Sequence, residues 1–136
     1  MPTQKLTVQT TVVAPIDRVW AAYISPEDIK QWNAATADWH TPSASVDFRE
    51  GGRFNWRMEA KDGSVGFDFA GTYTKIESNS LIEFDMGERQ TTVRFVPEQY
   101  GVRVSITFDA ELEHSIEQQR TGWQAILDSF KRHVEK

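Results

Sequence analysis

Most of this chain consists of segments in which apolar and polar residues alternate, separated by short turn sequences. The clearest alternation spans residues 102–108, and similar patterns begin near residues 46, 54, 65, 82 and 93. A period of two is typical of strands that bury one face. Three of the intervening turns are Glu50-Gly51-Gly52, Lys61-Asp62-Gly63-Ser64 and Ser78-Asn79-Ser80. We therefore predict six successive antiparallel strands joined by hairpins.

A long C-terminal helix is expected to cover the apolar face of this sheet. Between about Ser115 and Glu135, apolar residues recur at helical spacing: Ile116, Trp123, Ile126, Leu127, Phe130 and Val134. Polar residues occupy the opposite side, and the helix would be roughly 30 Å long. We expect Trp123 to be buried against the sheet with Ile126, Leu127 and Phe130. Trp123→Ala would then cost about 3–5 kcal/mol.

The first forty residues add a strand and two short helices. Residues 5–13 alternate like a half-buried strand, a helix begins at Pro15, and a second helix spans about Pro26–Gln31 behind Ser25. Residues 33–42 have no periodicity, and we expect an irregular segment there. The whole predicts one domain over residues 1–136 with an α+β helix-grip fold. In this fold a curved antiparallel sheet of about seven strands wraps around the long helix.

Five short motifs occur in an order that is typical of a known superfamily. They lie at residues 13–20, Trp32, residues 48–54, residues 69–73 and residues 117–127. With them the chain resembles the SRPBCC superfamily, also called START-like or birch-pollen-allergen-like. Within it, the chain is most similar to the group related to the C-terminal domain of the activator of heat-shock-protein-ninety ATPase. The resemblance implies the helix-grip fold, a cavity between sheet and helix, and no catalytic signature.

Composition excludes several kinds of site. The 136 residues include no cysteine, so disulfides, cysteine-ligated zinc and thiol catalysis are excluded. The three histidines, His40, His114 and His133, lack the paired spacing of a zinc site. Glu113 and Glu117 flank His114, but acidic residues at a helix N-terminus explain that cluster without a cation. We therefore expect no metal, no cofactor and no catalytic residue.

The net charge and the hydropathy of the chain exclude some classes of binding partner. The chain has 15 Lys and Arg against 20 Asp and Glu, a net charge of −5. Proteins that bind nucleic acid usually present a basic surface instead. No apolar run approaches the roughly 18 residues of a membrane span, and no signal peptide is recognisable. We therefore expect a cytoplasmic protein that binds neither nucleic acid nor membranes.

Aromatic side chains are the candidate walls of a ligand cavity, because such cavities are mostly apolar. The candidates are Trp20, Trp32, Trp39, Trp56, Phe67, Phe69, Phe84 and Trp123. The same residue types also form cores, and that reading is favoured for Trp20 and Trp123. Trp39, in the irregular segment, could close over the mouth of the cavity. Gly122 in the helix and Gly71 in a strand indicate close approach of helix and sheet.

Three functions remain open at this point. The first is non-enzymatic binding of an apolar or aromatic small molecule between the sheet and the C-terminal helix. The second is a chaperone-ATPase-activator-like module that binds a protein, which the resemblance implies. Here the chain begins directly with the first strand, whereas full activators carry a further N-terminal domain. The third is a cyclase or hydrolase. For this function the sequence shows no catalytic nucleophile together with a general base.

Overall fold

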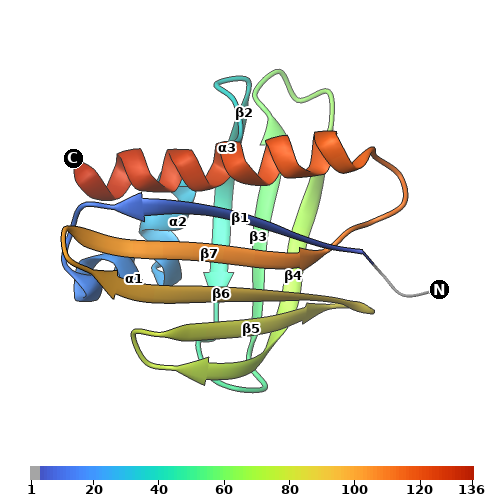
Figure 1. Ribbon diagram of the computed structural model, residues 1–136. Helices are drawn as coiled ribbons and strands as arrows, with labels where there is room; N and C mark the ends of the chain where they lie inside the picture. Colours follow the sequence, from blue (N-terminus) through green and yellow to red (C-terminus); the bar gives the residue numbers. More distant parts are fainter. Residues whose placement is uncertain (1–3) are drawn as a thin grey trace.

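The computed structural model describes residues 4–136, and its elements follow the expected order (Figure 1). The strands are β1 (Lys5–Val12), β2 (Trp39–Val46), β3 (Arg53–Ala60), β4 (Gly66–Glu77), β5 (Leu81–Met86), β6 (Arg89–Glu98) and β7 (Gly101–Asp109). The helices are α1 (Ile16–Ile24), α2 (Pro26–Trp32) and α3 (Ile116–Glu135). None of the helices in this part of the chain combines the length and apolar composition that a bilayer crossing needs.

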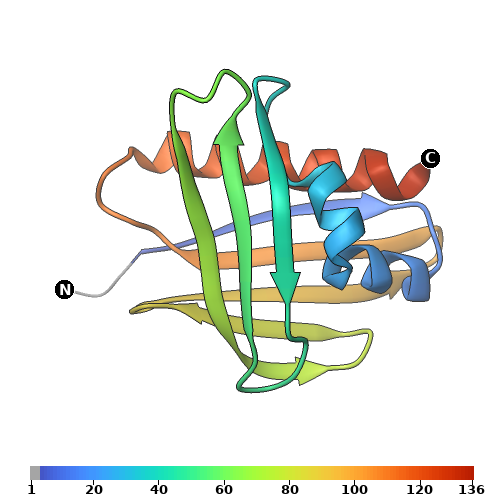
Figure 2. The ribbon, with the colours of Figure 1, turned by 180° about the vertical axis from the view of Figure 1, so that it is seen from behind.

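The seven strands form one antiparallel sheet in the order β1-β7-β6-β5-β4-β3-β2. The sheet is strongly curled, so that β2, β3 and β4 run at a steep angle to the other strands (Figures 1 and 2). Helix α3 lies along the hollow side, and α1 and α2 lie beside β2 near one end (Figure 2). This arrangement confirms the predicted α+β helix-grip fold.

Two turns use a backbone conformation that most residues avoid. Gly63 has φ of +78° between β3 and β4, and Asn79 has φ of +61° between β4 and β5. Glycine and asparagine are the residues that tolerate this left-handed region best. Both lie in turns predicted from the sequence, so the turn residues set where each hairpin reverses and which face each strand buries.

The core is aromatic and continuous between the sheet and the helices. Strand alternation brings Phe54, Phe84 and Phe95 to the concave side, each about 2% exposed. The Phe54 and Phe84 rings meet edge to face at 4.9 Å, a favourable geometry for aromatic pairs. Helix α3 contributes Leu127 and Phe130, which are 1% and 0% exposed. These residues fix α3 against the sheet.

The two short helices are held by specific hydrogen bonds. The Ser25 hydroxyl accepts a hydrogen bond from the backbone N–H of Asp28 at 3.4 Å and caps α2 as predicted. The indole N–H of Trp32, at the end of α2, donates to the carbonyl of Ala22 in α1 at 2.9 Å. Trp32 is therefore a buried link between α1 and α2.

The segment before β3 differs from the expectation of an irregular chain. Trp39 begins β2 and pairs with Ala60 of β3. The Thr41 hydroxyl donates to the Asn33 carbonyl at 2.7 Å and accepts from the Asn33 side-chain amide at 3.1 Å. The register shifts between His40 and Ser43. This irregularity in an edge strand explains why the sequence shows no period of two here.

Helix α3 differs from expectation at two adjacent residues. Trp123 is half-buried rather than buried, although its ring stacks on Phe108 at 4.1 Å and 11°. A methyl group added at Gly122 would meet no atom within 4 Å, so Gly122 does not mark a close contact with a strand. Gly71 does mark a close contact, but its neighbours are Phe54 and the Asp85 carbonyl of β5 rather than the helix.

Replacing Thr91 with valine should stabilise the protein. Thr91 is 1% exposed, and its hydroxyl has no hydrogen-bond partner among residues 4–136. A buried hydroxyl without a partner is unfavourable, so we expect Thr91→Val to raise the free energy of unfolding by about 1–2 kcal/mol. The matched control is Thr41→Val, which should lower it by about 1–3 kcal/mol because the Thr41 hydroxyl makes two hydrogen bonds. Urea denaturation of both variants measures these changes; equal effects would contradict the expectation.

Candidate functional site

A cavity of about 390 Å³ lies between the concave side of the sheet and the N-terminal half of α3. This volume is within the usual range for small-molecule pockets, about 300–1,000 Å³. Its inner end is formed by buried residues that include Trp32, Trp56 and Leu127. Its outer end includes Phe67, which is 47% exposed, and the exposed side chain of Gln118. The cavity therefore opens beside the hairpin of β3 and β4.

Flat aromatic rings form a continuous wall along the cavity. Trp56 of β3 stacks on Phe69 of β4 with ring centroids 5.3 Å apart and an interplanar angle of 26°. Phe69 meets Trp123 of α3 edge to face at 5.9 Å. Trp123 in turn stacks on Phe108 of β7. The cavity is thus bordered by ring faces and edges on both the sheet side and the helix side.

Gly122 widens the cavity on its helix side. It lines the cavity, and the position that its missing side chain would occupy is open space. Glycine in a helix interior costs about 1 kcal/mol relative to alanine. Among residues 4–136, no side chain or strand occupies the space that a Cβ at position 122 would take, so close packing does not explain this glycine. A larger residue at position 122 would project from the helix beside Trp123 and reduce the space for a ligand.

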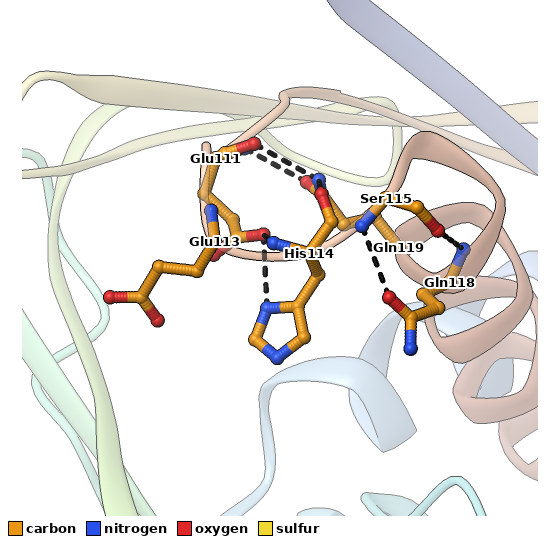
Figure 3. A network of polar contacts seen from close by, with 6 residues as sticks. All are labelled: Glu111, Glu113, His114, Ser115, Gln118 and Gln119. Carbon is orange, nitrogen blue, oxygen red and sulfur yellow. Dashed lines mark hydrogen bonds and ion pairs between the residues drawn. The ribbon is translucent and has the colours of Figure 1, made fainter.

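The polar end of the cavity is organised by the loop between β7 and α3 (Figure 3). The Glu111 carboxylate accepts hydrogen bonds from the backbone N–H of His114 at 2.8 Å and from its ring Nδ1 at 3.1 Å. The buried Gln119 side chain accepts from the Glu111 N–H at 2.8 Å and donates to the carbonyls of Glu111 and His114. Ser115 and Gln118 form a capping box at the start of α3.

These contacts hold Glu111 as a carboxylate. Desolvation acts to raise the pKa of Glu111, but hydrogen bonds from the backbone and ring of His114 outweigh it and lower that pKa. One possible ligand atom from each of Glu111, Glu113 and His114 lies within 4.8 Å of the other two. Glu117, expected beside His114, instead pairs with Arg120 at 3.1 Å. Because the hydrogen bonds explain this cluster, we assign no cation to it.

Tyr23 and Trp56 each add a buried polar group to the cavity wall. Burial raises the pKa of Tyr23 far above its usual value, and the nearby Tyr73 adds to this effect. The phenol of Tyr23 therefore stays protonated at neutral pH. The indole N–H of Trp56 is buried and has no hydrogen-bond partner within residues 4–136. A mostly apolar cavity with few polar groups is the usual composition of a small-molecule site.

The structure brings five of the eight candidate residues to the cavity. They are Trp32, Trp56, Phe67, Phe69 and Trp123. Trp20 and Phe84 are instead core residues, 8% and 2% exposed. Trp39 does not line the cavity; its ring contacts that of Phe67, with centroids 5.9 Å apart.

Sequence reasoning missed several residues at the polar end. Arg89 and Met86, which face each other across the turn between β5 and β6, both line the cavity. Met86 continues the alternation of Ile82 and Phe84, and Arg89 lies four residues before Val93 on the same strand. Because side chains two residues apart point to the same face of a strand, the sequence pattern could have placed both on the concave face. Gln118 could have been found from the pattern of Ser115 followed three residues later by glutamine.

Comparisons with known proteins agree with this architecture. A family model described as "Activator of Hsp90 ATPase homolog 1-like protein" matches residues 13–135. A search of curated proteins found no significant match. The solution structure of the AHSA1-like protein from Aeromonas hydrophila is 47% identical, with a TM-score of 0.91, covering 97% of this chain and 92% of that chain.

Two further solved structures extend the comparison. Chr148 from Cytophaga hutchinsonii is 41% identical, with a TM-score of 0.84, covering 96% of this chain and 92% of that chain. The crystal structure of protein CV1439 from Chromobacterium violaceum is 23% identical, with a TM-score of 0.84 and 99% of both chains covered. At that identity the likeness concerns the fold alone.

Proposed function

The chain belongs to the family of activator of Hsp90 ATPase homolog 1-like proteins, and we propose that it binds an apolar or aromatic small molecule. The observation that carries this proposal is the cavity of about 390 Å³ between sheet and α3. Its aromatic wall of Trp56, Phe69 and Trp123 is suited to stack against a flat ligand.

The apolar wall could supply most of the binding energy. Burying about 200 Å² of apolar ligand surface is worth roughly 5 kcal/mol at 25 cal/mol per Å². Costs of lost motion and side-chain ordering reduce this gain. We therefore expect the apolar contacts alone to give dissociation constants of roughly 1 mM, which corresponds to about −4 kcal/mol. Polar contacts at the end near Glu111 and Gln118 would strengthen binding and provide the selectivity.

Gly122→Leu should weaken ligand binding at least tenfold. The leucine side chain would enter the open space beside Trp123 and compete with the ligand for it. The matched control is Arg132→Leu, the same new side chain on an exposed part of α3, about 15 Å further along the helix. Titration with N-phenyl-1-naphthylamine, a neutral dye that fluoresces in apolar surroundings, measures the affinity.

The titration has two results that would contradict the proposal. One is the absence of saturable dye binding by the wild-type protein. The other is an affinity that Gly122→Leu and Arg132→Leu change equally, because the dye would then bind outside the cavity.

A second candidate function is a chaperone-binding module. It is supported by the family's description and by two exposed apolar side chains, Leu112 at 101% and Tyr100 at 77% exposure. Co-precipitation with the cognate chaperone and an ATPase assay test it. Unchanged ATPase turnover at saturating protein would contradict this candidate and leave the small-molecule proposal in place.

A cyclase or hydrolase activity would require a group at the cavity that can move a proton. Tyr23 lines the cavity with a protonated phenol, which can donate a hydrogen bond to a ligand but is a poor general base at neutral pH. Glu111 and His114 also line the cavity, where their hydrogen bond joins them within the loop between β7 and α3. Because no observation identifies a substrate bond for this pair to act on, we rank an enzymatic function below the two binding functions.

A further inference from the structure

We propose that the ligand of this cavity is an anionic aromatic molecule whose negative group pairs with Arg89. This inference rests on the proposed small-molecule function and names the chemical class of the ligand. The class comprises aromatic carboxylates, sulfonates and similar monoanions. The proposal joins two observations: Arg89 is the one cationic side chain of β1–β7 that lines the cavity, and the same cavity is lined by the buried aromatic residues Trp32 and Trp56.

The position of Arg89 follows from strand alternation. It is the first residue of β6 and lies across a two-residue turn from Met86. Thr91 and Val93 follow it at intervals of two and are buried on the concave side. Successive side chains of a strand point to opposite faces. Arg89 therefore shares the concave side, and it lines the cavity together with Met86.

A charge on this side of the sheet is exceptional. The other side chains that β1–β7 place on the concave face are apolar or neutral, such as Thr91 and Tyr73. The remaining strand arginines, exemplified by Arg94 and Arg103, occupy the convex face, where Arg103 pairs with Glu98 at 3.6 Å. Packing therefore does not explain a guanidinium at position 89.

No carboxylate within residues 4–136 lies within 4.0 Å of the Arg89 guanidinium. The charge of Arg89 acts on Asp109 without forming an ion pair with it. The hydrogen bond from Lys5 lowers the pKa of Asp109, and the charge of Arg89 adds to this lowering. Because Lys5 already pairs with Asp109 at 2.7 Å, Arg89 retains its capacity for another anion.

The other charged groups at this end are already engaged. The Glu111 carboxylate accepts hydrogen bonds from the backbone and ring of His114 and from the Glu113 N–H. The Glu111 carboxylate keeps its negative charge and is held within the loop by these hydrogen bonds (Figure 3), so it cannot itself bind an anion. The neighbouring Gln118 and Gln119 carry no charge. Arg89 would therefore be the principal partner of an anion bound in the cavity. Its hydrogen bonds to that anion would be charge-assisted, and such bonds are about twice as strong as neutral ones.

Two dyes with the same aromatic body test this inference. 8-Anilinonaphthalene-1-sulfonate carries a permanent negative charge, and N-phenyl-1-naphthylamine is its neutral counterpart. Both are titrated into the wild-type protein, Arg89→Gln and Arg94→Gln. Arg94→Gln is the matched control, since it removes the same charge from the convex face of the same strand.

We expect Arg89→Gln to weaken binding of the sulfonate about tenfold and to change binding of the neutral dye less than twofold. Retained binding of the neutral dye would show that the variant keeps an intact cavity. Arg94→Gln should change both affinities less than twofold. The inference is wrong if Arg89→Gln affects both dyes equally, or affects the sulfonate no more than Arg94→Gln does. If the wild-type protein binds neither dye, the proposed function fails with it.

Discussion

Phe130→Ala is expected to lower the free energy of unfolding by about 3–5 kcal/mol. Phe130 is 0% exposed and meets the rings of Tyr23 and Trp32 edge to face, at 5.4 Å and 5.0 Å. It therefore joins α3 to both short helices. Alanine would leave a void that well-packed neighbours cannot fill. This loss is a large part of the 5–15 kcal/mol that stabilises a typical domain.

The comparison variant is Trp123→Ala on the same helix. Trp123 is half-buried and borders an existing cavity, so its removal loses less packing. We expect a cost of roughly 1–2 kcal/mol, below the value predicted from the sequence pattern. Urea denaturation with a common m-value gives both free energies. A larger loss for Trp123→Ala than for Phe130→Ala would show that the core is centred elsewhere.

Gly71→Ala is expected to destabilise the protein by about 1–3 kcal/mol or more. The added methyl carbon would lie 2.5 Å from the carbonyl oxygen of Asp85 and 3.0 Å from two ring carbons of Phe54. The carbonyl belongs to the backbone of the neighbouring strand β5, so it can move away only if the sheet is distorted.

Gly122→Ala makes the same chemical change as Gly71→Ala but is expected to stabilise the protein. The new methyl group would enter open space, and alanine is favoured over glycine in a helix by up to about 1 kcal/mol. The thermal midpoint should therefore rise for Gly122→Ala and fall for Gly71→Ala. Two midpoints shifted in the same direction would contradict the assignment of a tight site at Gly71 and an open one at Gly122.

The sequence was most informative where its pattern is periodic. The alternation of residues 102–108 and the helical spacing of Leu127 and Phe130 predicted β7 and the buried side of α3. Turn residues such as Gly63 and Asn79 correctly predicted where the chain reverses between neighbouring strands. The pattern failed at Trp39, because a register shift in an edge strand removes the period of two.

The cavity itself was harder to predict than the fold. Aromatic residues that fill a core and those that border a cavity have the same periodicity, so Phe84 and Phe69 could not be distinguished. The helix glycine indicated an unusual position, but a close contact and an empty space both explain a glycine. Only the packing around Gly122 decides between them.

The central claim is that a small aromatic molecule binds between the sheet and α3. The five tryptophans offer a direct measurement, because each gives one indole N–H signal in a heteronuclear NMR spectrum of the ¹⁵N-labelled protein. Titration with N-phenyl-1-naphthylamine should shift the signals of Trp56 and Trp123 saturably, since both line the cavity. The signal of Trp20, in the core, should stay in place. Unchanged Trp56 and Trp123 signals, or a larger shift at Trp20, would contradict the claim.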